Sequence, residues 1–378
     1  MDFDLTDDQS ILKDSLTRLL ADEYDFEKRR AHRKGEAGFS DAMWGQFAEM
    51  GLLMAPFAEE DGGLGLGAVE TMVIMEAFGH ALVIEPYLAT VVLAGGVLRH
   101  AASAGQKAAL VPEIGAGSLR LALAHAERAA RYNLAQVESR AGKDGDGYVL
   151  DGAKSLVLHG DSAHKLIVSA RLSGAARDRG GLALFLVDAD APGVTRMGYD
   201  AQDGMRAAEI TLEGVRLGAD ALIGDEGSAL PVIERVVDEA MAALCAEAVG
   251  AMDEALALTL EHIKTRKQFG VALGSFQVMQ HRAAEVLVQI ELARSMALLA
   301  TFMAASDDDA ERHAAILAAK VQIGRSARFV GQQAIQMFGG VGVTDEYKVA
   351  HAFKRLTMID KAFGDADHHL KALAEAVG

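Results

Sequence analysis

The sequence predicts an α+β protein in which a helical segment, a β segment and a second helical segment follow one another along the chain. Three observations carry this prediction. Apolar residues have helical spacing in the first part, short β-prone runs fill the middle, and no proline follows Pro231 in the strongly helical last part. We place the predicted domains at residues 1–120, 121–222 and 223–378.

The first domain is expected to be helical because its apolar residues recur at helical intervals: Ile11, Leu12, Leu16, Leu19 and Leu20. A glycine-rich segment at 61–67 precedes a helix-like run at 68–76. No strand-like run leads into this segment, and no Lys-Ser or Lys-Thr pair follows it. We therefore interpret it as a loop between helices and not as a phosphate-binding loop.

The middle domain is expected to be a compact β domain. Its β-prone runs, at 148–150, 165–169, 182–187 and 208–212, are separated by Asp-Gly and Gly-Gly turns. In the last domain, one apolar stripe steps by three or four residues: Ile316, Ala319, Ile323, Ala327, Val330, Ala334 and Met337. Such a stripe is typical of a helix that packs in a bundle.

Composition excludes several classes of partner. The chain of 378 residues has 37 basic and 54 acidic side chains, a net charge of −17, which disfavours nucleic acid and anionic membranes. The single cysteine, Cys245, excludes an internal disulfide. The acidic start at 1–8 is unlike a signal peptide, and no uncharged apolar run approaches a membrane-spanning length. We expect a cytoplasmic protein.

We predict no metal site. The segment 364–369 contains two aspartates and two histidines, but it lacks a recognised ligand spacing and lies in a helix-like tail. We interpret its polar residues as a surface face of that helix. Cys245 lies among apolar neighbours without an adjacent cation, so we interpret it as a small core residue and not as a nucleophile.

Four segments together resemble the acyl-CoA dehydrogenases. They are Phe-Asp-Leu-Thr-Asp-Asp-Gln at 3–9, the glycine loop at 62–66, Thr-Arg-Lys-Gln-Phe-Gly at 265–270 and Phe-Gly-Gly-Val-Gly at 338–342. The resemblance implies an N-terminal helical domain, a middle β-barrel or β-sandwich domain and a C-terminal four-helix bundle. It also implies FAD as cofactor and an acyl-CoA thioester as substrate.

In this family FAD lies across a subunit interface, so each chain supplies two sets of contacts. One set lies on the bundle and reaches the pyrophosphate and adenosine end of a neighbour's FAD. By position, the resemblance assigns it to Arg266, Phe269, Gln277, Gln336, Gly339 and Gly340. These residue types suit the task, because guanidinium forks onto phosphate, amides donate and accept, and glycine permits close backbone approach.

The second set, which would hold the chain's own flavin ring, departs from the family. The family pattern is Thr-Glu-Pro-x-Ala-Gly-Ser-Asp followed by Trp-Ile-Thr or Trp-Ile-Ser. Here Ala126 and Leu158 replace hydroxyl residues, Leu156 replaces the tryptophan, and Tyr132 replaces a small residue. Each lost hydrogen bond weakens binding by about 0.5 to 1.5 kcal/mol. We therefore expect this cradle to be altered or empty.

The family's catalytic base is also missing. Its usual glutamate position aligns with Phe363, and the alternative position on the first long bundle helix aligns with Ala240. Glu239 is a weak candidate, because one residue along a helix is a rotation of about 100°. The apolar period predicts that Asp238 and Glu239 lie on the polar, solvated side of this helix. The catalytic residue is therefore unknown.

The resemblance leaves three functions open. The first is a subunit of a flavin-dependent dehydrogenase that forms 2,3-enoyl-CoA, with the base supplied by a larger homologous partner in an α2β2 heterotetramer. Within the family the chain resembles small subunits of enzymes acting on pimeloyl-CoA, which implies pimeloyl-CoA or another dicarboxylyl-CoA as substrate. The second is a non-catalytic subunit that completes a partner's FAD site. The third is different acyl-CoA chemistry on the same scaffold.

Overall fold

A computed structural model describes residues 5–377, with side chains up to residue 375. The predictions for the acidic start at 1–8 and the motif at 3–9 therefore lie partly outside the described residues. The described chain forms two compact units. The helical unit comprises residues up to 31, 67–83 and from 241 on, and the mixed unit comprises residues 32–66 and 84–240.

The helical unit begins with α1 (Asp7–Glu23), whose start is fixed by a reciprocal capping box between Thr6 and Gln9. Helix α4 (Ala68–Ala81) crosses α7 (Ala229–Thr265) at two glycines. A Cβ at Gly79 would lie 2.0 Å from the carbonyl oxygen of Glu247, and one at Gly250 would lie 1.9 Å from that of Glu76. The crossing therefore requires glycine at both positions.

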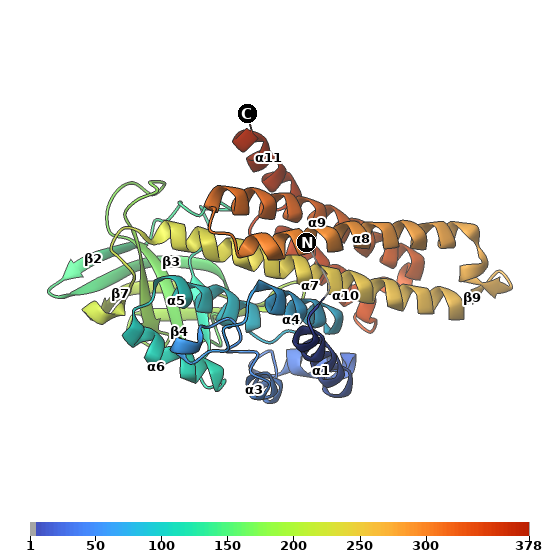
Figure 1. Ribbon diagram of the computed structural model, residues 1–378, viewed down its shortest axis with the longest axis horizontal. Helices are drawn as coiled ribbons and strands as arrows, with labels where there is room; N and C mark the ends of the chain where they lie inside the picture. The colour runs from blue at the N-terminus through green and yellow to red at the C-terminus, as the bar shows by residue number, and fades with distance from the viewer. Residues whose placement is uncertain (1–4, 378) are drawn as a thin grey trace. The chain divides into compact units, whose positions relative to one another are not determined.

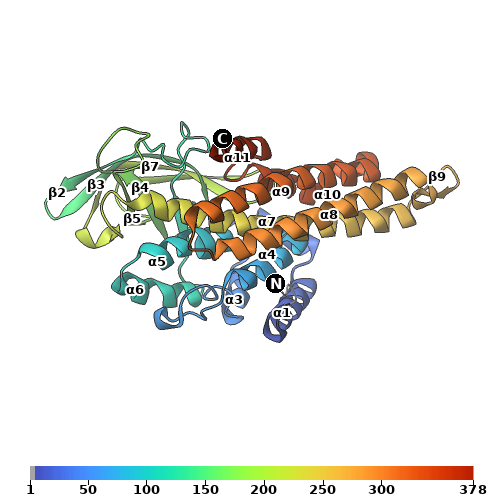
Figure 2. The same cartoon turned by 45° about the horizontal axis from the view of Figure 1, so that its top comes forward.

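The rest of this unit is a helical bundle joined by short connections. Its remaining elements are β9 (Lys267–Gln268), β10 (Val271–Ala272), η4 (Leu273–Ser275), α8 (Gln277–Ala304), α9 (Asp309–Phe338), η5 (Gly339–Val343), α10 (Lys348–Lys361) and α11 (Ala366–Val377). Helices α8 and α9 run side by side in both views (Figures 1 and 2). The predicted α9 stripe is buried along its whole length from Ile316 to Met337, which confirms that interpretation.

Helix α8 bears on the expectation about membrane-spanning segments. It is the one helix within residues 5–377 that is long and apolar enough to cross a membrane by length and composition. The expectation that no uncharged apolar run reaches this length still holds, because α8 carries charged residues such as Glu291 and Arg294. A single helix of this kind is weak evidence for a membrane span, since bundle helices pass the same test.

The mixed unit combines helices with one sheet. Its helical elements are η1 (Glu59–Asp61), η2 (Leu88–Ala94), η3 (Ala219–Ala221), α3 (Asp41–Glu49), α5 (Gly95–Ala101) and α6 (Ala104–Gly115), while α2 (Phe26–Lys34) and α7 contain residues of both units. Segment 61–67 ends η1 and leads into α4, as the loop interpretation predicted.

Eight strands form the sheet, and they occupy the region where β-prone runs were predicted. They are β1 (Leu121–Ala124), β2 (Arg140–Asp144), β3 (Gly147–Leu158), β4 (Lys165–Arg171), β5 (Leu182–Asp188), β6 (Val194–Asp200), β7 (Arg206–Leu217) and β8 (Leu222–Ile223). Their order is β6-β7-β3-β2-β4-β5-β8, with β1 parallel to β4. Buried side chains of the strands, including Leu150, Phe185 and Ile210, form the apolar core of the sheet. The domain boundaries at 120 and 222 stay a prediction.

Candidate active site

The six residues predicted to bind a cofactor lie at one end of the bundle. Arg266 follows α7, Phe269 is in the β9–β10 turn, and Gln277 begins α8, while the others are in the last turn of α9 or in η5. Arg282 donates to Gln333, which joins the start of α8 to the end of α9. Figure 1 shows β9 at the tip of the bundle. All six residues are exposed.

The β9–β10 hairpin holds Phe269 in an exposed position. Gln268 pairs with Val271, so Phe269 and Gly270 form a two-residue loop, with φ of 55° and 82°. Two positive φ values are typical of the turn that joins short antiparallel strands. The amide of Leu273 donates to the carbonyl of Arg266 at 2.9 Å and closes the hairpin base. The Phe269 ring lies edge-on to Phe276, with the centroids 6.2 Å apart, but it is still 89% exposed, a costly placement for an aromatic side chain.

The glycine pair after α9 has open space around it. A Cβ at Gly339 or Gly340 would meet no atom of this chain within 4 Å. The φ of 71° at Gly339 favours glycine, whereas Gly340 has no such backbone requirement. Its lack of a side chain is therefore unnecessary for packing within this chain and leaves room for an approaching group.

The structure brings together the predicted flavin-facing positions of the mixed unit. The amide of Ser155 donates to the carbonyl of Ala126 at 2.8 Å. A bulge in β3 places Ser155 and Leu156 opposite Glu209 of β7, and Glu209 accepts from the Ser155 hydroxyl at 2.9 Å. Leu156 is 50% exposed and has a φ of 54°, which is strained for a bulky residue. We call Ala126, Ser155, Leu156 and Leu158 the cradle edge.

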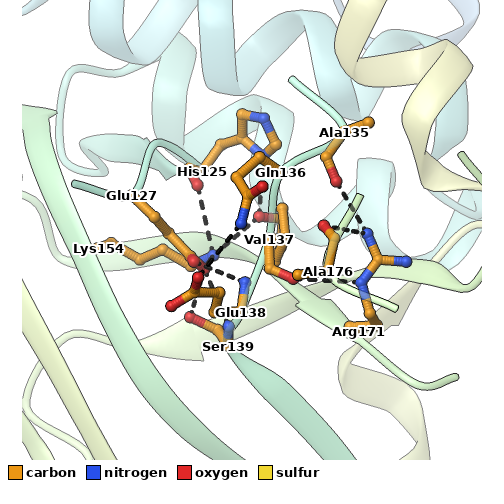
Figure 3. A network of polar contacts seen from close by, with 11 residues as sticks. His125, Glu127, Ala135, Gln136, Val137, Glu138, Ser139, Lys154, Arg171 and Ala176 are labelled. Atoms are coloured by element: carbon orange, nitrogen blue, oxygen red, sulfur yellow. Dashed lines mark hydrogen bonds and ion pairs between the residues drawn. The ribbon is translucent and has the colours of Figure 1, made fainter. Parts of the chain in front are cut away.

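Behind the cradle edge is a buried polar network that sequence reasoning missed (Figure 3). Lys154 Nζ lies 2.7 Å from Glu127 Oε1, 3.1 Å from Ser169 Oγ and 3.3 Å from the carbonyl oxygen of His125. Three acceptors match the three donors of an ammonium group. Strand alternation contained a signal, because Lys154 has the same inward parity as Tyr148 and Leu150 in β3.

Burial and the ion pair set the protonation of this network. Burial lowers the pKa of Lys154 to about 8, although Glu127 opposes the shift. Burial alone would raise the pKa of Glu127, but Lys154 and hydrogen bonds from Ser139 and Glu138 bring it below its ordinary value. Burial and the charge of Lys154 lower the pKa of His125 to about 3. At neutral pH the network therefore contains a charged pair beside a neutral imidazole.

The position of the usual base holds no carboxylate. Phe363 follows α10 with a φ of 59°, and Gly364 follows with a φ of 126°. A Cβ at Gly364 would lie 2.5 Å from Cε1 of His369. His369 is itself buried, so the surface interpretation of 364–369 is wrong for this residue. The reason is that α11 folds back and packs against α9.

The alternative base position fails for a different reason. Ala240 is fully buried, and Glu239 accepts from Arg99 at 2.6 Å, His100 at 2.7 Å and Arg235 at 3.2 Å. Burial would raise the pKa of Glu239, but these donors outweigh it and lower the pKa to about 2. A carboxylate held this firmly in its ionised form is a weak proton acceptor.

The same contacts correct the prediction that Asp238 and Glu239 lie on a solvated face. Asp238 is buried, and Glu239 is largely covered by its partners from α5. The helical period of α7 could not predict this burial, because the residues that cover Glu239 lie about 140 positions earlier in the chain.

No group of three or more His, Cys, Asp or Glu side chains among the described residues could hold a metal ion. Cys245 is buried, and burial raises the pKa of its thiol to about 12, so it is not an activated nucleophile.

Three family models match the chain in order. The models for the N-terminal, middle and C-terminal domains of acyl-CoA dehydrogenases match residues 6–118, 122–215 and 230–378. The chain belongs to the acyl-CoA dehydrogenase family. It is therefore an oxidoreductase of the class that acts on CH–CH bonds, and FAD is its cofactor.

Similar proteins include a named acyl-CoA dehydrogenase and a heteromeric complex. Acyl-CoA dehydrogenase FadE12 of Mycobacterium tuberculosis is 31% identical over 87% of this chain and 84% of its own length. A variant of the Tcur3481–Tcur3483 steroid ACAD is 28% identical, with a TM-score of 0.87 and coverage of 98% and 97%. The ChsE4–ChsE5 complex of M. tuberculosis is 25% identical, with a TM-score of 0.88 and coverage of 100% and 99%.

The two half-sites of this acyl-CoA dehydrogenase differ in how they fit FAD. The bundle end offers an exposed guanidinium, two exposed amides and an open glycine pair, which suit a nucleotide diphosphate. The cradle edge offers alkyl groups at Ala126, Leu156 and Leu158, where the polar rim of a flavin requires donors or acceptors. The first half-site fits the cofactor and the second does not.

Proposed function

We propose that this chain is one subunit of a heteromeric acyl-CoA dehydrogenase that converts an acyl-CoA to a 2,3-enoyl-CoA. The observation that carries the proposal is the contrast between its half-sites. The bundle end retains exposed groups suited to a neighbour's FAD, whereas Phe363, Ala240 and the clamped Glu239 leave the family's two base positions without an available carboxylate. A partner chain would supply the base and the main flavin cradle.

In this arrangement the chain's own residues bind and orient one end of the cofactor. Arg266 would fork onto a phosphate, the amides of Gln277 and Gln336 would hydrogen-bond the nucleotide, and Gly340 would allow close approach. Phe269 would cover an apolar face and lose its exposure in the assembly. FAD, when bound, supplies the electron acceptor for oxidation of the CH–CH bond.

The exposed face of α8 supports the presence of a partner. Large apolar side chains lie open along this helix: Val278, Leu287, Val288, Leu292 and Leu299. A face of this kind marks a protein interaction surface. We propose a larger homologous subunit as the occupant, in an α2β2 heterotetramer. The single cysteine, Cys245, supports a cytoplasmic location.

For the substrate we propose pimeloyl-CoA or another dicarboxylyl-CoA, supported by the resemblance to small subunits of such enzymes. The purified complex should oxidise pimeloyl-CoA with a higher kcat/KM than heptanoyl-CoA, which has the same chain length without the distal carboxylate. Equal values for the two thioesters would contradict the assignment of a dicarboxylyl substrate and leave the heteromer proposal intact.

The main experiment purifies the complex from its native host and measures flavin per chain. We expect a second, homologous chain, and we expect the affinity for flavin to fall at least about tenfold when Arg266 is changed to alanine, because a charge-assisted contact contributes about 1.5 to 3 kcal/mol. Arg18→Ala removes an exposed charge from α1 and should leave flavin retention unchanged. An isolated chain that binds one FAD and oxidises acyl-CoA at ordinary rates would overturn the proposal.

The lack of a base at Phe363 equally favours a non-catalytic subunit that only completes the partner's FAD site. In that case the partner reconstituted with FAD but without this chain would turn over slowly, with the same KM for acyl-CoA as the complex. Adding this chain would raise the flavin occupancy without altering kcat per bound flavin. Product formation without reduction of an electron acceptor would instead indicate a different acyl-CoA reaction.

A further inference from the structure

The cradle edge has alkyl side chains at positions 126, 156 and 158, yet the polar network behind it is complete. Lys154 has no exposed side-chain surface, and its partner Glu127 is also buried. Glu127 accepts from the Ser139 hydroxyl at 2.6 Å, the Ser139 amide at 3.0 Å and the Glu138 amide at 2.6 Å, in addition to Lys154. Four donors satisfy both carboxylate oxygens in a region with little water.

These contacts join four separate pieces of backbone. Glu127 follows β1, Ser139 precedes β2, Lys154 lies in β3 and Ser169 lies in β4. Ser169 Oγ lies 2.9 Å from Nδ1 of His125, which extends the network to the residue before Ala126. The residues on either side of the pair are therefore tied to it: Ala126 precedes Glu127, and Ser155 follows Lys154.

A buried ion pair of this kind is poor evidence for stability, because an apolar pair of similar volume is often as stable. It is better evidence for a fixed geometry, since each charge must remain beside its partners to avoid an uncompensated buried charge. Here the geometry that it fixes is the spacing between segment 125–127 and β3. That spacing is spanned by the hydrogen bond from Ser155 to Ala126.

We propose that Lys154 and Glu127 are positioning residues that hold the cradle edge in the shape of a ring-binding surface. The loss of flavin contacts is then confined to the side chains at positions 126, 156 and 158, and the backbone remains preformed. The inference rests on the proposed function only for assigning this edge as the flavin-facing position. The preformed backbone makes the cradle edge competent to bind a planar ring once hydroxyl groups are restored at positions 126 and 158.

Arg171 provides a matched control. Like Lys154 it is a fully buried cation in the mixed unit, and it donates to the carbonyls of Ala135 and Val137 in the loop that also carries Ser139 (Figure 3). The other acceptors of its guanidinium are carbonyls between residues 173 and 180, so none of these hydrogen bonds reaches segment 125–127 or β3. Arg171→Met should therefore lower stability without loosening the cradle edge.

The first test measures amide hydrogen exchange in the isolated chain by mass spectrometry with fragmentation. The two variants are compared at the same distance from their unfolding midpoints. The Ser155 amide should exchange about tenfold faster in Lys154→Met than in Arg171→Met. This ratio corresponds to a difference of about 1.4 kcal/mol in the free energy of local opening. If Lys154→Met does not fold, the double variant K154M/E127Q removes both charges and gives the same readout. Equal exchange at Ser155 in the Lys154 and Arg171 variants would overturn the proposal.

The second test restores the hydroxyl groups. The double variant A126T/L158T should bind riboflavin 5′-phosphate at least about tenfold more tightly than the unmodified chain, as followed by quenching of flavin fluorescence. Adding Lys154→Met should abolish this gain, and adding Arg171→Met should preserve it. A double variant that binds no tighter than the unmodified chain would overturn the preformed edge. Because both tests use the isolated chain without acyl-CoA, they are independent of whether a partner subunit exists.

Discussion

Individual buried histidines make the folded protein sensitive to acid. His125 is neutral in the folded chain because burial and Lys154 lower its pKa to about 3, and burial lowers the pKa of His369 to about 4. In the unfolded chain both take up protons near pH 6.5. The unfolded state therefore binds more protons between those limits, and stability falls as the pH falls through this window.

For His125 alone, the free energy of unfolding should fall by about 2 to 3 kcal/mol between pH 7 and pH 4.5, as 1.36 kcal/mol accompanies each pKa unit. In urea unfolding at the two pH values, the loss of unfolding free energy should be about 2 to 3 kcal/mol smaller for His125→Gln than for the unmodified chain. His281→Gln, which changes an exposed histidine of α8, should show the original loss. An unchanged pH dependence in His125→Gln would mean that His125 is protonated in the folded chain.

Residue burial was predictable where it follows a local period, and not where it depends on distant contacts. The inward parity of Lys154 follows from strand alternation with Tyr148 and Leu150. Its partner Glu127 does not, because 27 residues separate the two. The solvated placement of Glu239 was wrong for the same reason, since Arg99 lies 140 residues earlier in the chain.

At the scale of elements, the glycine pair after α9 allows a proposed role in cofactor binding to be tested without disturbing the packing of this chain. A methyl group at Gly340 contacts nothing within 4 Å in this chain, so Gly340→Ala should change the unfolding free energy of the isolated chain by no more than about 0.5 kcal/mol. In the complex, the same methyl group should obstruct the cofactor and lower retained flavin, measured by absorbance after gel filtration.

Gly45→Ala is the control, because Gly45 lies in α3, where a Cβ also meets nothing within 4 Å. This change should stabilise α3 by about 0.5 to 1 kcal/mol and leave flavin content unaltered. A Gly340→Ala complex that keeps all of its flavin would contradict the assignment of this glycine to the cofactor.

Most helices and strands could be predicted from the sequence, whereas the left-handed backbone positions beside them could not. Helical and β periods predicted the α9 stripe and the β runs, because these patterns are local. The positive φ values at Leu156, Phe269 and Phe363 carry no such pattern, since none of these residues favours a left-handed backbone. Only the resemblance directed attention to those three positions.

At the scale of the whole molecule, the exposed face of α8 is the surface proposed to contact the partner subunit. Leu292 and Val288 are four residues apart, on one side of the helix, and are 47% and 58% exposed. Leu292→Glu should leave the isolated chain stable, because the side chain packs little within it. In the complex it should place a charge in an apolar interface and shift the mass measured by light scattering toward separate chains.

The control for this change is Glu285→Gln, which alters an exposed charge near the start of α8 without adding one. We expect the Glu285→Gln complex to keep its mass. If the Leu292→Glu complex also keeps its mass, the partner binds elsewhere and the role proposed for the α8 face is wrong.

The crossing of α4 and α7 determines which parts of the gene tolerate change. Every amino acid except glycine carries a Cβ, and at Gly79 or Gly250 that carbon would lie about 2 Å from a main-chain carbonyl oxygen of the other helix. Each missense change in either codon therefore meets the same obstacle, whatever side chain it introduces. At these two codons synonymous changes are tolerated, whereas every amino-acid substitution forces the two helices apart.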